Sequence, residues 1–374
     1  LDRSSLPSGF SKASSETAAP GSLSPRGGLS LLPSQDPLLG DQQPLWHETC
    51  SISGRLSPVH SMLEDDALKT GRRVPEPVVA IAADEDVGLA IAHALEQLSL
   101  GRLLRPADVV MIKPSLTTMR GYRRSAITKP EALRAVIRAV KGWSHRRVIV
   151  AEASGDLSTQ DLLSFSGAGE VVAEEGVDFV DLSDPPFVDL AIDHAHPGKV
   201  VLNRVVTTVD VIISLSMLKQ HEEATISACM KNIALGVPAG QVYSLPKADI
   251  SGVPKPGRTD FHADLHGLIV AMNRLLPIDL AVLDCSEVMT VSGPTEGKVT
   301  RAGMAIAGTD AVAVDATGAR FLGFKPQAVQ YLWRASAEGL GESAVDRIEY
   351  RGLSFGIAAQ RFTKRVFGKE IVVK

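Results

Sequence analysis

The feature that most constrains the fold is an alternation that begins at Val78, where short apolar runs rich in β-branched residues take turns with longer stretches of helical periodicity. This alternation is typical of a parallel β-sheet covered by helices. It predicts strands over residues 78–83, 108–112, 147–152, 177–181, 210–215 and 279–284, and helices over residues 87–98, 130–141, 160–175, 225–235, 262–275 and 310–322. We therefore expect an α/β domain with a mostly parallel sheet flanked by helices.

Residues 185–208 interrupt the alternation, because two segments of strand composition follow one another there without a helix between them. Strands joined in this way pair antiparallel, so we expect an antiparallel excursion. The interruption also allows the domain, predicted over residues 76–374, to consist of two subdomains, 76–208 and 209–374. A long loop is expected over residues 236–260, and loops of such length often bind or cover ligands.

Residues 1–75 are rich in Ser, Pro and Gly and lack sustained periodicity. Such a segment cannot bury enough apolar surface to offset the entropy lost on ordering, so we expect a disordered N-terminal extension. It contains no continuous apolar run followed by a small-residue cleavage site, which argues against a secretory signal. Its many serines and few acids keep organelle targeting as an alternative to a cytoplasmic location.

Charge, cysteine content and hydropathy exclude several classes of function. The net charge is −4 and the pI is near 6.2, so neither nucleic acid nor a membrane surface is an expected partner. The three cysteines, Cys50, Cys229 and Cys285, are far apart and form no CxxC pair. We expect no disulfide framework and no iron–sulfur cluster held by the chain's own cysteines, as suits a reducing compartment. No apolar run reaches the roughly 18 residues of a membrane-spanning helix, so a soluble protein is expected.

Polar side chains directly follow several of the predicted strands. Because ligands of α/β sheets bind outside the carboxyl ends of the strands, these side chains are the first candidates for a functional site. They are Lys113, Ser115, Glu152, Lys219, His221 and Asp284.

The segment "KQHEEATISACMKN", from Lys219 to Asn232, is the densest group of such residues. Lys219 and His221 are two residues apart and therefore lie on one side of an extended chain. A nearby lysine favours neutral imidazole, so we expect His221 to act as a general base near neutral pH. Lys113, Lys219 and Lys231 would hold an anionic group of the substrate.

Thr225 is expected to cap the helix that follows, whose N-terminal amides would add an anion-binding end. The alternative for the whole segment is a solvated loop in which Glu222 and Glu223 pair with the lysines. Spacing alone favours the solvated loop, because a single K-x-H is a weak motif.

A divalent metal is a second alternative, held by His221 with oxygen ligands from Glu152, Asp284 and Asp315. The chain contains no HxH or HExxH spacing that would support it directly. His262 and His266 stand four apart, as two ligands on one helical face would, although a surface or substrate-loop helix is the favoured explanation of that spacing.

The loop "VSGPTEG" is rich in turn residues, and its Gly293 and Gly297 would permit positive φ and close approach of the backbone to a ligand. It has neither a P-loop pattern nor the strand-to-helix setting of a dinucleotide-binding loop, so nucleotide binding is not expected. Further along, Asp310 is a natural N-cap for the helix that follows it, and the role of Asp315 is open.

Taken together, these motifs resemble the family known as domain of unknown function 362 (DUF362). The segments that carry the resemblance are "VVMIKPSLT", "AITKPEALRAVIRAV", "VIISLSMLKQHEEATISACMKNIALG" and "SGPTEG…IAGTDAVAVDATGARFLG". They span about residues 78–345. The polar and turn positions that match the family pattern are Lys113, Thr128, Glu131, Lys219, His221, Thr225, Lys231, Asn232, Gly293, Pro294, Gly297, Asp310 and Asp315.

Two positions depart from that pattern, with Ser115 where the family usually has Asn and Lys129 where it often has His. Many relatives also carry an appended ferredoxin-like cysteine module, which this chain lacks. The resemblance implies a shared cleft, in which Ser115, Thr128, Thr225, Lys231, Asn232, Gly293 and Gly297 would contact the substrate.

Three functions remain open on the sequence. The first is an enzyme that acts on a small carboxylated or phosphorylated molecule, with His221, Lys219 and Lys113 as its catalytic groups. The second is a non-catalytic redox accessory or binding module that works with a separate ferredoxin-like protein. The third is a metal-dependent oxidoreductase or isomerase. The sequence leaves the cofactor and the oligomeric state undetermined.

Overall fold

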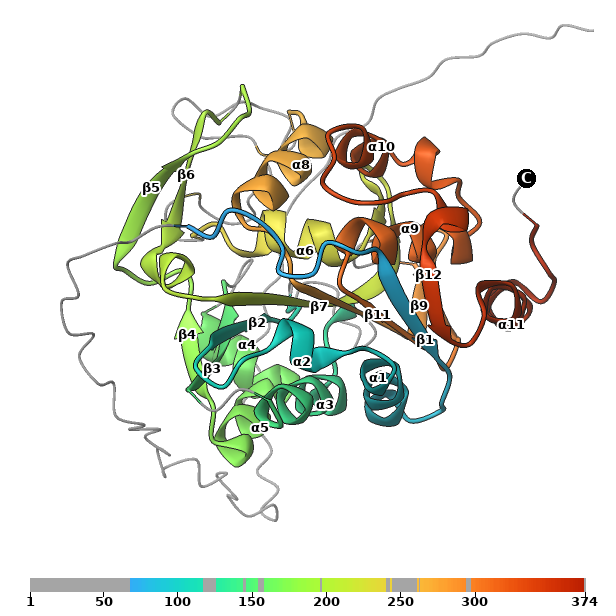
Figure 1. The fold of residues 1–374 in the computed structure, drawn as a ribbon, viewed down its shortest axis with the longest axis horizontal. Helices are drawn as coiled ribbons and strands as arrows, with labels where there is room; N and C mark the ends of the chain where they lie inside the picture. Colours follow the sequence, from blue (N-terminus) through green and yellow to red (C-terminus); the bar gives the residue numbers. More distant parts are fainter. Residues whose placement is uncertain are drawn as a thin grey trace, which may run out of the picture. The chain divides into compact units, whose positions relative to one another are not determined.

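A ten-stranded sheet runs through the part of the chain that the computed structural model describes (Figure 1). The described residues are 68–116, 126–143, 146–153, 158–195, 197–239, 243, 261, 263–293 and 297–372. Along the sheet the strands follow the order β12 (Glu349–Gly352), β1 (Val78–Ala82), β11 (Ala305–Gly308), β9 (Leu280–Thr290), β7 (Val211–His221), β2 (Val109–Lys113), β3 (Arg147–Glu152) and β4 (Asp178–Asp181).

The sheet is mixed. The strands from β9 through β7, β2 and β3 to β4 are all parallel, whereas β11 is antiparallel to both of its neighbours. Two short strands extend it, β8 (Thr225–Ser227) beside β7 and β10 (Lys298–Arg301) beside β9. The predicted mostly parallel sheet is thus confirmed, and all carboxyl ends of its parallel half meet at one edge.

Helices cover both faces of the sheet (Figure 1). One face carries α1 (Val87–Glu96), α2 (Leu100–Leu103), α3 (Pro130–Lys141), α4 (Thr159–Ser166) and α5 (Ala168–Glu175). The other carries α6 (Cys229–Gly236), α8 (Leu265–Leu275), α9 (Ala311–Phe321), α10 (Gln330–Ala337) and α11 (Phe355–Phe367). Short 3₁₀ turns lie at Arg204–Thr207, Pro326–Ala328 and Val345–Arg347.

Burial on both faces explains why the strands read as continuous apolar runs. In β7, ten of the eleven residues are buried, and Gln220 is the exception. The helices instead bury one stripe, as in α3, where apolar residues recur at helical spacing after Pro130 at the first turn. The two periodicities that predicted the elements therefore follow from which faces are covered.

The predicted antiparallel excursion is also confirmed. The strands β5 (Phe187–Ala191) and β6 (Lys199–Asn203) pair antiparallel as a separate two-stranded sheet. The predicted loop over residues 236–260 lies almost wholly outside the described residues, as do residues 1–67 of the N-terminal extension.

Residues 68–75, the end of that extension, are described and contact the domain through ion pairs. Lys69 pairs with Asp279, Arg72 with Asp310 and Arg73 with Asp108. No described helix is long and apolar enough to cross a membrane.

The region after β7 differs from the prediction. The strand predicted to end at residue 215 continues to His221, and the chain then returns as β8 instead of entering a helix. The helix predicted to begin near Thr225 begins at Cys229. The difference arises because β8 pairs with the end of β7, with Lys219 opposite Ser227 and His221 opposite Thr225, and this pairing overrides local helical periodicity.

Candidate functional site

Three predicted site residues, Lys113, Glu152 and Asn232, meet at the carboxyl edge of β2 and β3. Lys113 and Glu152 form an ion pair, and their side chains are 1% and 2% exposed. The Lys113 ammonium also donates to the Pro114 carbonyl oxygen at 2.8 Å and lies 3.4 Å from Asn232 Oδ1. Burial lowers the pKa of Lys113 and raises that of Glu152, and the attraction between them opposes both shifts.

Asn232 of α6 connects this pair to β7. Its side-chain amide donates to the Lys113 carbonyl oxygen at 3.0 Å and to Ser214 Oγ at 3.1 Å. Gly236, one turn later, packs so closely that a Cβ there would lie 2.6 Å from Lys113 Nζ. The C-terminal half of α6 is therefore fitted tightly over the end of β2.

Ser115 and Thr128 bond to each other where the chain passes over the same edge. Thr128 Oγ1 accepts from the Ser115 amide at 2.8 Å, the Thr128 amide donates to the Ser115 carbonyl oxygen at 2.9 Å, and the Thr128 hydroxyl donates to the Leu215 carbonyl oxygen at 3.3 Å. Both side chains are buried. Thr128 thus joins the segment after β2 to β7.

Lys219 and Lys231 are two buried lysines of the site whose pKa values are lowered. Lys219 is 0% exposed and its ammonium donates to the Ala126 carbonyl oxygen at 2.9 Å. Burial, and then the nearby charge of Lys231, lowers the pKa of Lys219 to about 7. Burial lowers the pKa of Lys231 to about 8, although Glu223 acts in the opposite direction. Neither ammonium forms an ion pair within the described part of the chain.

His221 ends β7 on the same side as Lys219. Its Nδ1 accepts hydrogen bonds from the backbone amides of Glu223 and Ala224, each at 3.2 Å. Because Nδ1 is an acceptor, the neutral ring carries its proton on Nε2. The imidazole closes the turn between β7 and β8, and Thr225 leaves that turn with a left-handed φ of 68°.

The prediction that Thr225 caps the next helix is wrong. Thr225 belongs to β8, and the residue before α6 is Ala228, which has no capping side chain. The amides at the start of α6 are bonded instead to Asp315 of α9, from Cys229 N to Oδ1 at 2.9 Å and from Met230 N to Oδ2 at 3.1 Å. A carboxylate from a distant helix therefore occupies the predicted anion-binding end.

The four predicted metal ligands do not form one cluster. Glu152 pairs with Lys113 and Asp315 binds the start of α6, while Asp284 lies beside Lys129 with 3.9 Å between Oδ2 and Nζ. Burial raises the pKa of Asp284 and, to about 7, that of Asp315. Among the described residues, no group of three or more His, Cys, Asp and Glu side chains is arranged to hold a metal.

Lys129, which departs from the family pattern, directly precedes α3 and contacts polar residues of β9. Its ammonium donates to Ser286 Oγ at 2.5 Å and pairs with Glu287 at 3.2 Å. Asp284 Oδ1 accepts from the Ser286 amide, whereas Oδ2 is buried and forms no hydrogen bond with the described residues. The ends of β9 and α3 thus add a second polar group at the same edge.

The glycine prediction needs correction, since neither Gly293 nor Gly297 has a positive φ, and the left-handed residue in this loop is Val291 with φ 76°. A side chain at Gly293 would overlap the carbonyl oxygen of Gln220 in β7. Gly293 is therefore required for close approach of two backbone segments. Pro294, like His262, lies outside the described residues.

Sequence reasoning missed three residues that support the site, namely Ser214, Asn273 and Tyr331. Ser214 donates to the Cys229 carbonyl oxygen at 2.9 Å, Asn273 Nδ2 donates to the Met230 carbonyl oxygen at 2.9 Å, and the Tyr331 hydroxyl donates to Asp315 at 3.2 Å. Only Ser214 left a signal in the sequence, as a polar residue within the apolar run of β7.

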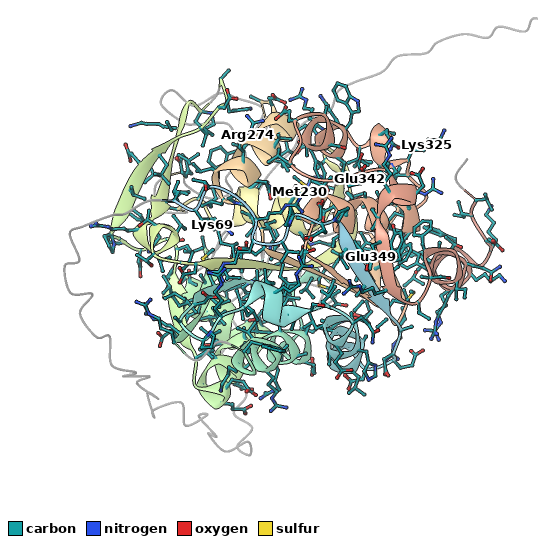
Figure 2. The ribbon with its side chains drawn as sticks, in the orientation of Figure 1. Lys69, Met230, Arg274, Lys325, Glu342 and Glu349 are labelled. Atoms are coloured by element: carbon teal, nitrogen blue, oxygen red, sulfur yellow. The ribbon has the colours of Figure 1, made fainter. Side chains whose placement is uncertain are left out.

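A cavity of about 220 Å³ lies at the opposite, amino edge of the parallel strands. Met230 of α6 and Arg274 of α8 line it (Figure 2), together with Arg72 of the segment before β1. None of the predicted site residues contributes to its wall. The cavity is therefore separate from the candidate site residues at the carboxyl edge.

Known proteins resemble this chain over most of the domain. A thylakoid-associated protein of Synechocystis sp. is 25% identical over 254 residues, which span 66% of this chain and 73% of that protein. The lactate racemase apoprotein from Thermoanaerobacterium thermosaccharolyticum is structurally similar with a TM-score of 0.40 and 16% identity over 67% of this chain. A Thermotoga maritima protein has a TM-score of 0.37 and 11% identity over 72% of this chain.

The similarity covers 58% and 60% of those two solved chains, so this chain spans about three fifths of their lengths. The compartment of this chain stays a prediction, because the name of the Synechocystis protein describes that protein alone. The model of the family described as domain of unknown function (DUF362) matches residues 110–320, more than half of the 374 residues. The chain belongs to the DUF362 family.

Proposed function

We propose that the protein is an enzyme that binds a small carboxylated or phosphorylated molecule at the carboxyl edge of β7 and uses Lys219 in proton transfer. The observation that carries this proposal is the burial of Lys219 and Lys231 without an ion-pair partner among the described residues. Burying an unpaired charge is costly. An anionic ligand would remove that cost, because it supplies the missing counter-charge to both ammonium groups.

The contacts of Lys219, His221 and Lys231 suggest which of them transfers a proton and which binds the anion. With its pKa near 7, Lys219 is partly neutral at physiological pH and can accept a proton. His221 is better suited to donate a hydrogen bond from Nε2, because its Nδ1 is engaged by two backbone amides. Lys231 would hold the anion. This assignment moves the role of general base from His221, where the sequence suggested it, to Lys219.

Lys113 takes a supporting role in this proposal. Its charge is already balanced by Glu152, so it offers less attraction to a ligand than Lys219 and Lys231, which form no ion pair with the described residues. Its contact with Asn232 instead holds α6 over the site.

Isothermal titration with sulfate tests the anion site, since sulfate keeps a constant charge across the neutral range. The wild-type chain should bind sulfate, and Lys219→Met and Lys231→Met should each weaken binding about tenfold or more, equivalent to ~1.4 kcal/mol. Lys325→Met is a matched control, because that lysine is exposed and comes from another part of the domain (Figure 2). Absence of sulfate binding, or equal loss in the control, would overturn the proposal.

Deuterium exchange tests the acid–base part. A base at Lys219 that removes a carbon-bound proton would return deuterium to a small carboxylic acid in D₂O, which NMR detects. Exchange that disappears in Lys219→Met supports the mechanism, and exchange that persists removes Lys219 from it. Sulfate binding without exchange for any acid in a broad panel would favour the non-catalytic binding module instead.

A further inference from the structure

Two aspartates five residues apart in "GTDAVAVD" cap two different helices. Asp310 caps its own helix, α9, by accepting from the Ala313 amide at 3.0 Å. Asp315 lies one and a half turns into α9 and accepts instead from the first two amides of α6. The same short motif therefore sets the start of α9 and the start of a helix more than eighty residues earlier in the chain.

The first turn of α6 is held on both sides. Asp315 is 0% exposed and is itself held by the Tyr331 hydroxyl at 3.2 Å. On the other side, Asn273 Nδ2 donates to the Met230 carbonyl oxygen at 2.9 Å. Met230 is thus bonded through its amide to α9 and through its carbonyl to α8, and Lys231 is the next residue.

We infer that Asp315 is a positioning residue for the anion site, which acts by anchoring α6 so that Lys231 and Asn232 are held at the carboxyl edge. The inference rests on the proposed function for the identity of the ligand. Its physical reason is the shortness of α6, whose eight residues would be marginal as a helix without a cap. Without Asp315, two buried amides would also lose their acceptor.

This role differs from the one that the sequence suggested for Asp315. Both carboxylate oxygens are already bonded, to Cys229, Met230 and Tyr331. Asp315 therefore acts on the ligand only through α6, and the test requires a measurement of α6 itself beside a measurement of binding.

Hydrogen–deuterium exchange and sulfate titration on the same full-length variants provide that test. In Asp315→Ala, amides of the peptide covering residues 229–236 should exchange at least about tenfold faster, and the Kd for sulfate should rise about tenfold. Asp315→Asn keeps the shape and one acceptor oxygen, so it should fall between Asp315→Ala and the wild type. Tyr331→Phe should weaken binding least, because both helix amides keep their acceptors.

Asp310→Asn is the matched control, since it removes part of a buried aspartate cap from the same helix but leaves α6 untouched. In Asp310→Asn, the backbone amides at the start of α9 should exchange faster, and the Kd for sulfate should stay within about twofold of the wild-type value. All variants are compared well below their unfolding temperatures. If Asp315→Ala does not fold, the order of wild type, Tyr331→Phe and Asp315→Asn carries the test.

Three results would overturn the inference. Unchanged exchange over α6 in the Asp315 variants would show that Asp315 does not anchor the helix. Faster exchange with unchanged sulfate affinity would show that the anchor does not serve the site, while the proposed function would stand. No sulfate binding by the wild-type chain would refute the proposed function and the inference together, whatever the exchange shows.

Discussion

Lys113 and Glu152 form an ion pair at the ends of two neighbouring parallel strands, and each side chain is almost completely buried. The pair is satisfied on all sides, because Glu152 also accepts from the amides of Leu116 and Ala153, each at 2.9 Å. A buried ion pair of this kind adds little net stability as long as it is intact. Breaking it leaves an uncompensated charge.

We therefore expect Glu152→Gln to lower the free energy of unfolding by about 3–5 kcal/mol, measured by urea denaturation. The double variant Lys113→Met with Glu152→Gln should recover part of that loss, because neither of these two positions then carries a buried charge. Lys199→Met serves as a control, since its pair with Asp189 is exposed to solvent and its loss should change stability far less than Glu152→Gln does. A smaller loss in Glu152→Gln than in the double variant would contradict this account.

Stability should rise with pH above neutrality because of Lys219. Its pKa is about 7 in the folded chain against an ordinary value of 10.5, so the unfolded chain binds more protons between these values. The free energy of unfolding contributed by this group then increases from pH 7 to about pH 10.

Lys219→Met should consequently be more stable than the wild type at pH 7, by about 2 kcal/mol after loss of the bond to Ala126. The difference should shrink toward pH 10. Urea denaturation at several pH values measures both. A variant less stable than the wild type by the same amount at every pH would show that Lys219 is not destabilising when charged.

Sulfate binding should have the opposite dependence on pH. The anion attracts the protonated lysines, whose pKa values are about 7 and 8, so affinity should increase as pH falls from 9 to 6 and level off below that. Titration calorimetry should also show proton uptake on binding near pH 8. In a Lys219→Met, Lys231→Met double variant the residual affinity should be nearly independent of pH, and a profile as steep as that of the wild type would exclude these lysines.

The left-handed backbone conformation of Thr225 should lower the stability of the folded chain. Its φ of 68° is strained for a β-branched residue, so Thr225→Gly should raise the free energy of unfolding by about 1 kcal/mol. Val291→Gly is a matched control, because Val291 has a φ of 76° and is 82% exposed, and this variant should stabilise the chain similarly.

Sulfate affinity distinguishes the two variants. Thr225 follows the turn that His221 closes, so greater freedom there should weaken binding, whereas Val291→Gly should leave affinity unchanged. Equal affinities in both variants would argue that the strain at Thr225 does not serve the site.

The sequence by itself determined the class of fold and the edge of the sheet at which the candidate polar residues gather. The alternation of apolar runs and helical stretches reports which faces are buried, and that pattern is local, so it predicted the parallel half of the sheet and the antiparallel strands β5 and β6. Asp310 was likewise predictable as a cap, because it bonds an amide only three residues away.

Only the tertiary structure decided the partners of the remaining polar groups. Lys113 meets Asn232 across 119 residues and Asp315 meets Cys229 across 86, and such contacts depend on which strands and helices become neighbours. The extension of β7 by pairing with β8 placed Lys219 and His221 in a strand and left Thr225 outside the helix. Burial then lowered the pKa values of Lys219 and Lys231. A pKa depends on the surroundings of the side chain, and no spacing in the sequence records those surroundings.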